Sequence, residues 1–234
     1  MPQRVAISQS NYIPWKGYYD TIASVDVFVL YDEVQYTRRD WRNRNRIKTA
    51  QGPAWLTIPV EVTGRYLQRI SEVTVADTTW ADTHWQTIRH QYSGAAAAAD
   101  FMDDLAALYR NSPRTRLSEI NEYHLSGICA MLGIRTPLRQ SSEFTLAGDR
   151  SERLLNICRE LGATVYVSAP AARDYLDVEL FAAAGVAVEW VDYAGYPEHR
   201  QLHPPFDHHV SIVDLLLNEG RQAPRFMKHV GGGR

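Results

Sequence analysis

Short apolar runs alternate with an amphipathic segment at the start of the chain. Residues Arg4 to Gln9 and Val25 to Tyr31 are predicted to be strands, and Tyr18 to Ser24 between them is predicted to be a helix. Both strands lack polar alternation, which is typical of a parallel sheet covered on both faces. The pattern therefore predicts a strand, a helix and a second strand joined by a right-handed crossover.

The last third of the chain alternates between helices and strands again. The predicted order is helix, strand, helix, strand and helix, at residues 151–161, 164–168, 171–184, 186–191 and 212–218. Gly162 and Gly185 are expected to end the first two of these helices. Such alternation is typical of α/β proteins.

The middle of the chain is predicted to be mostly helical. A strand-like stretch at residues 55–62 contains Pro59, which cannot donate to a ladder and so favours an edge or a bulge. Helices are then predicted at residues 77–92, 95–110 and 117–132. We therefore predict one α/β domain over residues 1–234, with an open, mostly parallel sheet flanked by helices and a helical insertion at about residues 77–133.

The composition allows a large buried core. The 234 residues are 45% apolar and 11% aromatic. No apolar run approaches the roughly 20 residues that a bilayer span needs, so we expect a cytoplasmic protein without membrane insertion. Cys129 and Cys158 lie in apolar, helix-like segments without CxxC spacing, and both are interpreted as core thiols.

Positive charge is concentrated in one segment of a chain whose net charge is only −2. Residues 36–48, called the basic segment below, contain six Arg and Lys residues and one Asp, which gives a local charge of +5. Guanidinium groups match the paired oxygens of phosphate or carboxylate and stack on rings such as Tyr36 and Trp41. The segment is a candidate anion site, and a solvated loop whose arginines pair with acids elsewhere on the chain is the structural alternative.

A second candidate lies at residues 9–17, where the first predicted strand ends and the first helix begins. Open parallel sheets hold ligands at this place, and the helix would point its N-terminal dipole at them. The segment offers amides, hydroxyls, an indole and a cation, but it is neither a Walker loop nor a GxGxxG motif. A rigid turn built by Pro14 and Trp15 is the structural alternative.

Polar residues also follow two other predicted strands. Asp32 and Glu33 come directly after the second strand, where a carboxylate could hold Mg²⁺ beside a phosphate or act as a general base. Pairing with a nearby arginine is the structural alternative. Ser168 ends a later strand and precedes Arg173 and Tyr175, which together would form a second anion site. Ser168 lacks a GxSxG motif and a recognisable base for a nucleophilic role.

Four of the eight histidines lie close together. His199, His203, His208 and His209 fall within eleven residues, and imidazole is the commonest metal ligand. Their spacing matches no known ligand pattern, and neither cysteine is near. No metal ligand is therefore assigned, and the sequence leaves the role of this loop open.

Several of these segments together resemble the WbqC-like protein family. The resemblance rests on Ile7 to Asp20, Asp26 to Tyr36, Arg39 to Lys48 and Trp55 to Pro59, and it extends through residues 168–176, 181–188 and 211–218. Members occur in surface-polysaccharide, O-antigen and natural-product gene clusters, so the resemblance implies a role in modifying sugars or small metabolites. Ser10 departs from the family pattern, which commonly has proline there, and this puts the shape of the turn in doubt.

We expect an enzyme that transfers an acyl or aminoacyl group to an amine on a nucleotide or nucleotide-sugar-like substrate, as a transferase or an ATP-dependent ligase. A non-catalytic accessory protein that binds an anionic ligand or a partner enzyme is one alternative. RNA binding through the interleaved Arg, Asn and Trp residues is another, and the near-neutral charge of the whole chain argues against it.

The candidate site residues follow from these patterns. Catalysis is assigned to Asp32, Arg44 and Ser168. Substrate binding is assigned to Gln9, Asn11, Tyr12, Trp15, Gln35, Arg42, Asn43, Asn45, Arg46, Lys48, Arg173 and Tyr175. The sequence identifies no cofactor, and a nucleotide with Mg²⁺ is the one that this chemistry would use. The expected partner is an anionic small molecule, and self-association into a homo-oligomer stays open.

Overall fold

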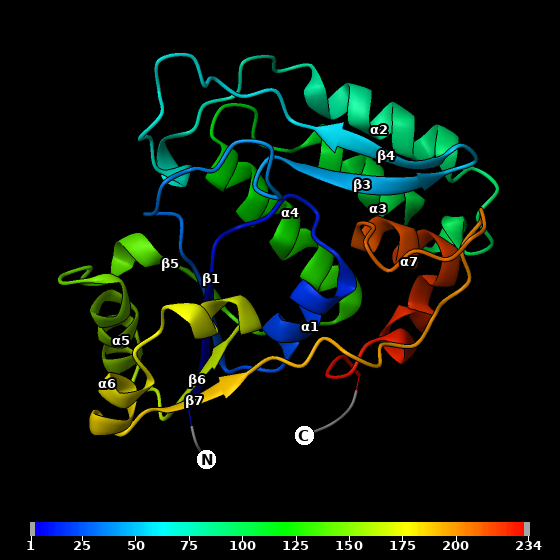
Figure 1. The fold of residues 1–234 in the computed structure, drawn as a ribbon. Coiled ribbons are helices and arrows are strands. Elements are labelled where there is room, and N and C mark those ends of the chain that lie inside the picture. Colours follow the sequence, from blue (N-terminus) through cyan, green and yellow to red (C-terminus); the bar gives the residue numbers. More distant parts are fainter. Residues whose placement is uncertain (1–2, 232–234) are drawn as a thin grey trace.

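A five-stranded parallel sheet forms the centre of the structure, a computed structural model that describes residues 3–231 (Figure 1). The strands are β1 (Arg4–Ser8), β2 (Val27–Leu30), β5 (Leu138–Gln140), β6 (Val165–Ser168) and β7 (Ala187–Trp190). Their order is β5-β2-β1-β6-β7, and every neighbouring pair is parallel. The predicted α/β class and the open, mostly parallel sheet are thus confirmed.

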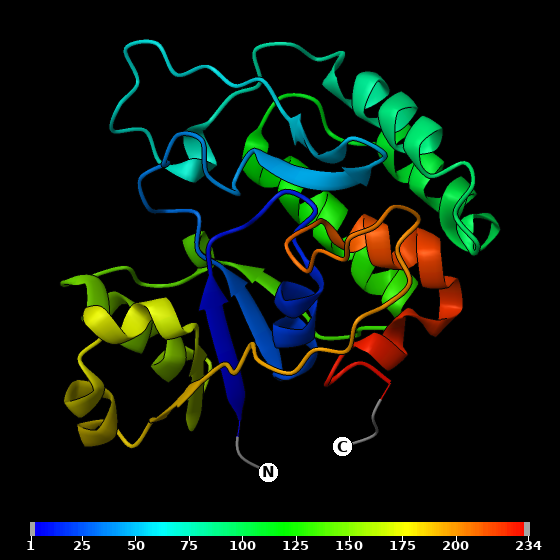
Figure 2. The same cartoon turned by 45° about the vertical axis from the view of Figure 1, so that its right-hand side comes forward.

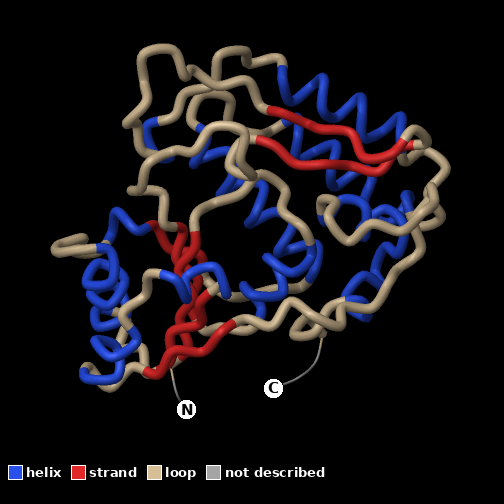
Figure 3. Tube along the Cα trace, viewed as in Figure 1, coloured by secondary structure: helices blue, strands red, loops and turns tan. Residues whose placement is uncertain are grey.

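Helices and a separate hairpin surround this sheet. The helices are α1 (Lys16–Ala23), α2 (Trp80–Gln91), α3 (Ala98–Arg110), α4 (Leu117–Leu132), α5 (Arg150–Glu160), α6 (Val178–Ala183) and α7 (Ile212–Glu219). Short 3₁₀ turns occupy Ile70–Glu72, Ser141–Glu143, Pro170–Asp174 and Gly220–Phe226. The hairpin consists of β3 (Arg44–Thr49) and β4 (Gly52–Thr57), which pair antiparallel and lie apart from the main sheet (Figure 3). No helix of the described residues is long and apolar enough to cross a bilayer.

Alternate residues of the central strands face opposite sides of the sheet, and each side has its own core. Ile7 and Val29 share a core with side chains of α5 and α6. Ala6 and Phe28 belong to the larger core on the other side, with α1 and α4. The two pairs of helices lie on opposite sides of the sheet in Figures 1 and 2. Burial of both faces explains why the strand sequences lack polar alternation.

Two parts of the predicted element pattern need correction. The helix predicted at residues 171–184 is wrong in its first half, where the chain forms a 3₁₀ turn and becomes α-helical only at Val178. The second half of the basic segment, for which no strand was predicted, is β3. The predicted helical middle is occupied by α2, α3 and α4. The division of residues 1–234 into one domain with an insertion stays a prediction.

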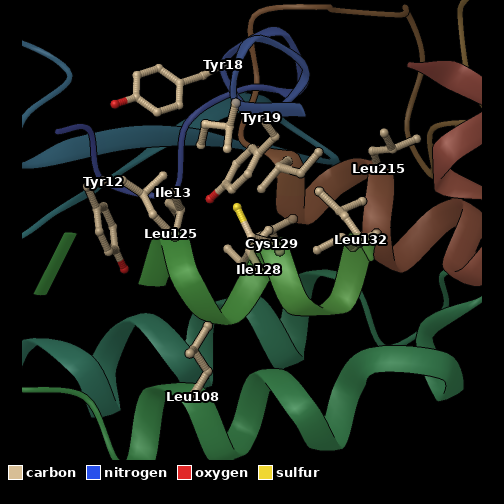
Figure 4. Packing of buried hydrophobic residues seen from close by; sticks show 14 of the residues in the cluster. Tyr12, Ile13, Tyr18, Tyr19, Leu108, Leu125, Ile128, Cys129, Leu132 and Leu215 are labelled. Atoms are coloured by element: carbon tan, nitrogen blue, oxygen red, sulfur yellow. The ribbon is translucent and has the colours of Figure 1, made fainter. Parts of the chain in front are cut away.

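Helix α4 lies at the centre of the larger core. Figure 4 shows Leu125 and Cys129 of this helix facing Ile13 and Tyr19, which approach from the N-terminal part of the chain. Burial raises the pKa of the Cys129 thiol to about 12. The thiol therefore stays protonated and acts as a small apolar side chain, as the sequence indicated.

Two buried histidines lie in an aromatic cluster between α2, α3 and α4. The hydroxyl of Tyr12 lies 2.9 Å from Nδ1 of His84 and 2.7 Å from the hydroxyl of Tyr109. The ring of His124 packs edge-on against Tyr109, with ring centroids 4.9 Å apart. Burial lowers the pKa of His84 to about 4 and that of His124 to about 3. Both imidazoles are thus neutral at pH 7, as a core position requires.

Acid should destabilise the protein through these histidines. The unfolded state takes up a proton near the usual His pKa of about 6.5, whereas folded His124 does not, so stability falls as the pH drops from 6.5 toward the folded pKa. His124→Asn should remove about 2 kcal/mol of the loss in unfolding free energy between pH 7 and pH 5. Denaturant melts at the two pH values measure this difference. The matched control is His90→Asn on the exposed side of α2, and an equal pH dependence in both variants would contradict the assignment.

Candidate functional site

The strand order reverses between β1 and β6, and parallel sheets form a crevice beyond the carboxyl ends of the strands at such a point. Residues 9–15, called the β1 corner below, cross this edge. Ile13 in the corner has a φ of 35°, a region that β-branched residues rarely adopt. Its side chain is fully buried, so packing holds the strained backbone in place.

Hydrogen bonds join the β1 corner to the basic segment. The backbone N–H of Tyr12 donates to the carbonyl of Trp41 at 3.1 Å, and the side-chain amide of Asn45 donates to the carbonyl of Tyr12 at 3.1 Å. The start of α7 adds two more bonds, because the N–H groups of Ser211 and Ile212 donate to the carbonyls of Arg46 and Pro14 at 2.8 and 2.9 Å. The two segments that the sequence singled out therefore lie side by side.

A cavity of about 520 Å³ opens where these segments meet. It is called the aromatic pocket below. Its walls come from the β1 corner, the basic segment and the loop that follows β7, and they are formed by Pro14, Trp15, Trp41, Asn45, Tyr193, Gly195, Tyr196, His208 and His209. The size and the aromatic walls with a few polar groups suit a small organic ligand.

Guanidinium groups and indole rings stack beside this pocket. The rings of Trp41 and Trp55 lie 5.4 Å apart, and both are partly exposed. Arg44 lies 4.1 Å from the Trp55 ring, and Arg46 lies 5.7 Å from Trp55 and 6.0 Å from Trp41. The set of Trp41, Arg44, Arg46 and Trp55 is called the Arg–Trp ladder below. It arises because Arg44 and Arg46 alternate on one face of β3 and Arg46 is directly opposite Trp55 on β4.

Most of the positive charge of the basic segment has no acidic partner among the described residues. The ion pairs of the segment there are Arg42–Asp40 at 3.4 Å and Arg46–Asp207 at the long distance of 4.0 Å. Arg44 donates instead to a backbone carbonyl, that of Arg39. The structural alternative, in which the arginines pair with acids, thus applies to Arg42 and Arg46, whereas Arg38, Arg39 and Arg44 form no ion pair with a described residue. The use of the ladder as an anion site stays a prediction.

Asp32 lies one layer beneath the β1 corner with one oxygen unused. Its Oδ1 accepts the N–H of Ser10 at 2.9 Å, whereas its buried Oδ2 has no partner. Burial raises the pKa of Asp32, although the bonds to Ser10 and the charge of Arg42 act in the opposite direction. The Oδ1 of Asn121, whose amide donates to the Ser10 hydroxyl, is also buried without a partner. Two oxygens beneath the β1 corner, Asp32 Oδ2 and Asn121 Oδ1, are therefore open to a further donor.

The loop after β7 brings an imidazole into the pocket wall. Nδ1 of His208 is buried and has no partner, and its ring packs edge-on against Phe206 with centroids 4.5 Å apart. Burial, and then the positive charge of Lys16, lower the pKa of His208. Burial lowers the pKa of Lys16 to about 8, and its ammonium group donates to the carbonyl of Pro197 at 2.6 Å. The lowered pKa favours the neutral imidazole of His208, whose buried Nδ1 has no hydrogen-bond partner among the described residues.

Buried hydrogen bonds to Asp214 of α7 hold this loop in place. Asp214 Oδ2 accepts from Nε2 of His199 and from the amide of Gln201, both at 2.8 Å. Its Oδ1 accepts the hydroxyl of Tyr92 at 3.0 Å. The cluster of loop histidines therefore has at least one structural member. Within residues 3–231, no group of three or more His, Cys, Asp or Glu side chains is arranged to hold a metal ion.

Part of the predicted site converges on the pocket. Trp15 and Asn45 line it, and Arg44 and Arg46 belong to the ladder beside it. Arg42 donates to the side-chain oxygen of Asn11, which places both at the outer edge of the β1 corner.

Other predicted residues have structural contacts. Tyr12, Asn43 and Lys48 are buried, and their polar groups bond to His84 and Tyr109, to the Ile58 carbonyl and to the Pro205 carbonyl, respectively. The backbone carbonyl of Gln9 accepts the Tyr18 hydroxyl, and the exposed Gln35 donates to the carbonyl of Tyr66. The assignment of these residues to substrate binding stays a prediction.

Ser168, Arg173 and Tyr175 lie away from the pocket walls. The hydroxyl of Ser168 is buried 3.4 Å from that of Tyr166. Arg173 packs over Trp190 at 5.2 Å, and Tyr175 is exposed beneath Arg150. The site residues assigned from the sequence leave out eight residues of the pocket and the ladder, namely Pro14, Trp41, Trp55, Tyr193, Gly195, Tyr196, His208 and His209. The alternation of β3 and β4 could have indicated Trp55, whereas the loop residues carry no periodic signal.

The arrangement can be compared with known proteins. The sequence pattern of the WbqC-like protein family matches residues 9–226. The chain belongs to this family. The match includes every residue of the pocket and the ladder, so the site is built within the WbqC-like region. Membership associates the chain with polysaccharide biosynthesis and goes no further.

One similar relative comes from Mycobacterium tuberculosis. It bears the name "Uncharacterized protein Rv1507c" and is 48% identical over 227 residues, which cover 97% of this chain and 98% of the relative. No solved structure matches the chain at a significant level.

Two equally buried carboxyl groups should respond oppositely to loss of charge. Asp32→Asn should leave the unfolding free energy at pH 7 unchanged or higher. The pKa of Asp32 is raised from its usual value of about 3.8, so at pH 7 the folded protein carries an ionised group that burial disfavours, and the neutral amide removes this cost. The amide oxygen can still accept the N–H of Ser10. Asp214→Asn should lose about 2–3 kcal/mol, because four side-chain donors face its carboxylate. Urea denaturation at pH 7 measures the unfolding free energy of both variants. If Asp32→Asn loses as much unfolding free energy as Asp214→Asn, Asp32 is a structural residue.

Proposed function

We propose that this protein is a transferase of surface-polysaccharide or natural-product biosynthesis that acts on a nucleotide-sugar-like substrate. It transfers an acyl or aminoacyl group to an amine of that substrate. The observation that carries the proposal is the junction of the aromatic pocket with the Arg–Trp ladder. Flat apolar walls adjoin two guanidinium groups there, of which Arg44 has no ion pair among the described residues and Arg46 has one long ion pair, 4.0 Å to Asp207. A ligand that combines rings with phosphate matches both parts.

The ladder supports the anionic half of this ligand. Arg44 and Arg46 are held by stacking on indoles, and this leaves guanidinium N–H groups free for phosphate oxygens. The Nε atoms of both arginines are buried and have no hydrogen-bond partner. A phosphate held here would place the remainder of the ligand against Trp41, which belongs to both the ladder and the pocket wall.

The pocket supports the sugar or base half. Trp15, Tyr193 and Tyr196 present ring faces and edges, and such surfaces pack against flat or weakly polar rings. His208 supplies a neutral nitrogen in the same wall. Because His208 lines the cavity and Asp32 is buried beneath the corner, the proposal gives the base role to His208. Asp32, whose Oδ2 has no partner among the described residues, remains a polar group beneath the site without an assigned step.

The transfer step follows ordinary acyl chemistry. The amine nitrogen attacks the carbonyl carbon of the acyl donor, the C–N bond forms, and the bond from that carbon to its leaving group breaks. His208 takes the proton that the nitrogen loses. Arg44 and Arg46 stabilise negative charge on the bound phosphate and on the departing group.

Nucleotide-sugars should raise the melting temperature of the wild-type protein. A ligand at 100 times its dissociation constant adds about 2.7 kcal/mol to the unfolding free energy. The probes are nucleoside diphosphate sugars and ATP, each with and without Mg²⁺. Arg46→Gln and Trp15→Ala should each need at least about ten times more ligand for the same rise in melting temperature. The first variant removes a charge-assisted bond and the second removes a stacking surface.

The matched control is Arg159→Gln in the exposed last turn of α5, which should bind the probes like the wild type. No stabilisation of the wild type by any probe would refute the ligand class. Binding without release of an acylated product, when acyl donors and amines are added, would favour the non-catalytic accessory protein instead.

A further inference from the structure

The loop between β4 and the turn at Ile70–Glu72 carries the two most exposed large apolar side chains of the described residues. Tyr66 is 69% exposed and Leu67 is 82% exposed. The loop extends at the upper left of Figure 1, beyond the hairpin. Adjacent large apolar side chains at a loop tip are unfavourable in water and mark a contact surface.

The tip is held firmly, so its exposure is a fixed feature of the fold. The side-chain amide of Gln35 donates to the carbonyl of Tyr66 at 2.8 Å, and the N–H of Tyr36 donates to the carbonyl of Gln68 at 2.9 Å. The amide of Gln68 donates to the carbonyl of Glu61 at 2.9 Å, which closes the base of the loop. These bonds keep Tyr66 and Leu67 pointing away from both cores.

Exposed arginines surround the tip. Arg38 stacks on the Tyr66 ring at 4.5 Å, Arg65 is the preceding residue, and Arg39 is the neighbour of Arg38. Among the described residues, none of these three forms an ion pair. Two acids at the base of the loop bond to Arg69 at 2.8 Å, Glu33 to its guanidinium group and Glu72 to its backbone N–H, while Glu61 is exposed and forms no ion pair with a described residue. The three arginines therefore outnumber the one free acid near the tip. The tip thus combines apolar side chains with unpaired positive charge.

We propose that this tip, Arg38, Arg39, Arg65, Tyr66 and Leu67, docks the protein on an anionic lipid surface. The arginines would contact lipid phosphates, while Tyr66 and Leu67 enter the headgroup region. A protein partner is a poorer match, because two apolar side chains are far fewer than a stable protein interface of about 800 Å² per partner uses. RNA is a poorer match, because an aliphatic side chain at the tip offers no stacking plane.

Sedimentation with vesicles tests the docking surface. The wild type should sediment with vesicles that contain phosphatidylglycerol and remain in solution with vesicles of phosphatidylcholine alone. Leu67→Asp should reduce the bound fraction on anionic vesicles by at least about tenfold, because it buries a charge in place of an apolar side chain. Arg65→Gln should weaken binding about fivefold, as expected for one arginine near an anionic surface.

The control is Val178→Asp, which introduces the same charge at an exposed apolar position on α6. It should sediment like the wild type. The proposal is overturned if the wild type ignores anionic vesicles, or if Leu67→Asp sediments as well as Val178→Asp. If inorganic phosphate displaces the protein from the vesicles, the tip is a site for free phosphate instead. If the wild type binds a single-stranded RNA, and Leu67→Asp and Arg65→Gln lose that binding equally, the tip is an RNA site instead. Because the Leu67 variant should keep its nucleotide-sugar stabilisation, failure of either proposal is recognised separately.

Discussion

The structure of the site depends on the bond between the β1 corner and the hairpin. The N–H of Tyr12 donates to Trp41, and the amide of Asn45 returns a bond to the carbonyl of Tyr12. Between these bonds and the contact of Pro14 with α7, Ile13 is held at a φ of 35° that an isoleucine would otherwise avoid. Backbone strain of about 1–3 kcal/mol persists only where several independent contacts hold the same conformation. The corner therefore brings the end of the central strand and the charged hairpin into one fixed arrangement.

This arrangement explains how a near-neutral protein keeps a concentrated positive surface. Alternation along β3 sends Arg44 and Arg46 to the face where Trp41 and Trp55 lie, while Ile47 on the opposite face is buried in the larger core. The indoles support the guanidinium groups without neutralising them, in contrast to a carboxylate partner. The hairpin thus anchors itself through its apolar face and presents charge through the other.

The fold could be predicted further than the site. Buried strands such as β1 and β2 have no polar alternation, and α4 ends at a glycine with a φ of 74°, so hydrophobic periodicity and turn chemistry identified them nearly to the residue. Strand β3 was missed because its alternating residues are Arg and Asn, and the charge of the segment concealed the period of two. The pocket wall at Tyr193 and His208 lies in a loop that is held by tertiary hydrogen bonds to Asp214. A local sequence pattern does not predict such long-range bonds. Prediction therefore succeeded where local period and burial agree, and it failed where distant segments complete a wall.

Asp32 and Asp214 show how a structural polar group differs from a candidate functional one. Both carboxyl groups are almost fully buried; Asp32 follows β2, and Asp214 lies in the first turn of α7. Every oxygen of Asp214 accepts from a donor of the protein, so its burial is explained by the loop and helix that it joins. Asp32 satisfies only one oxygen, and Asn121 beside Ser10 likewise keeps its oxygen unpaired. Leaving buried acceptors without donors costs about 1–3 kcal/mol each, and an apolar side chain at either position would avoid that cost. Stability alone therefore does not account for Asp32 and Asn121 beneath the β1 corner, whereas it does account for Asp214.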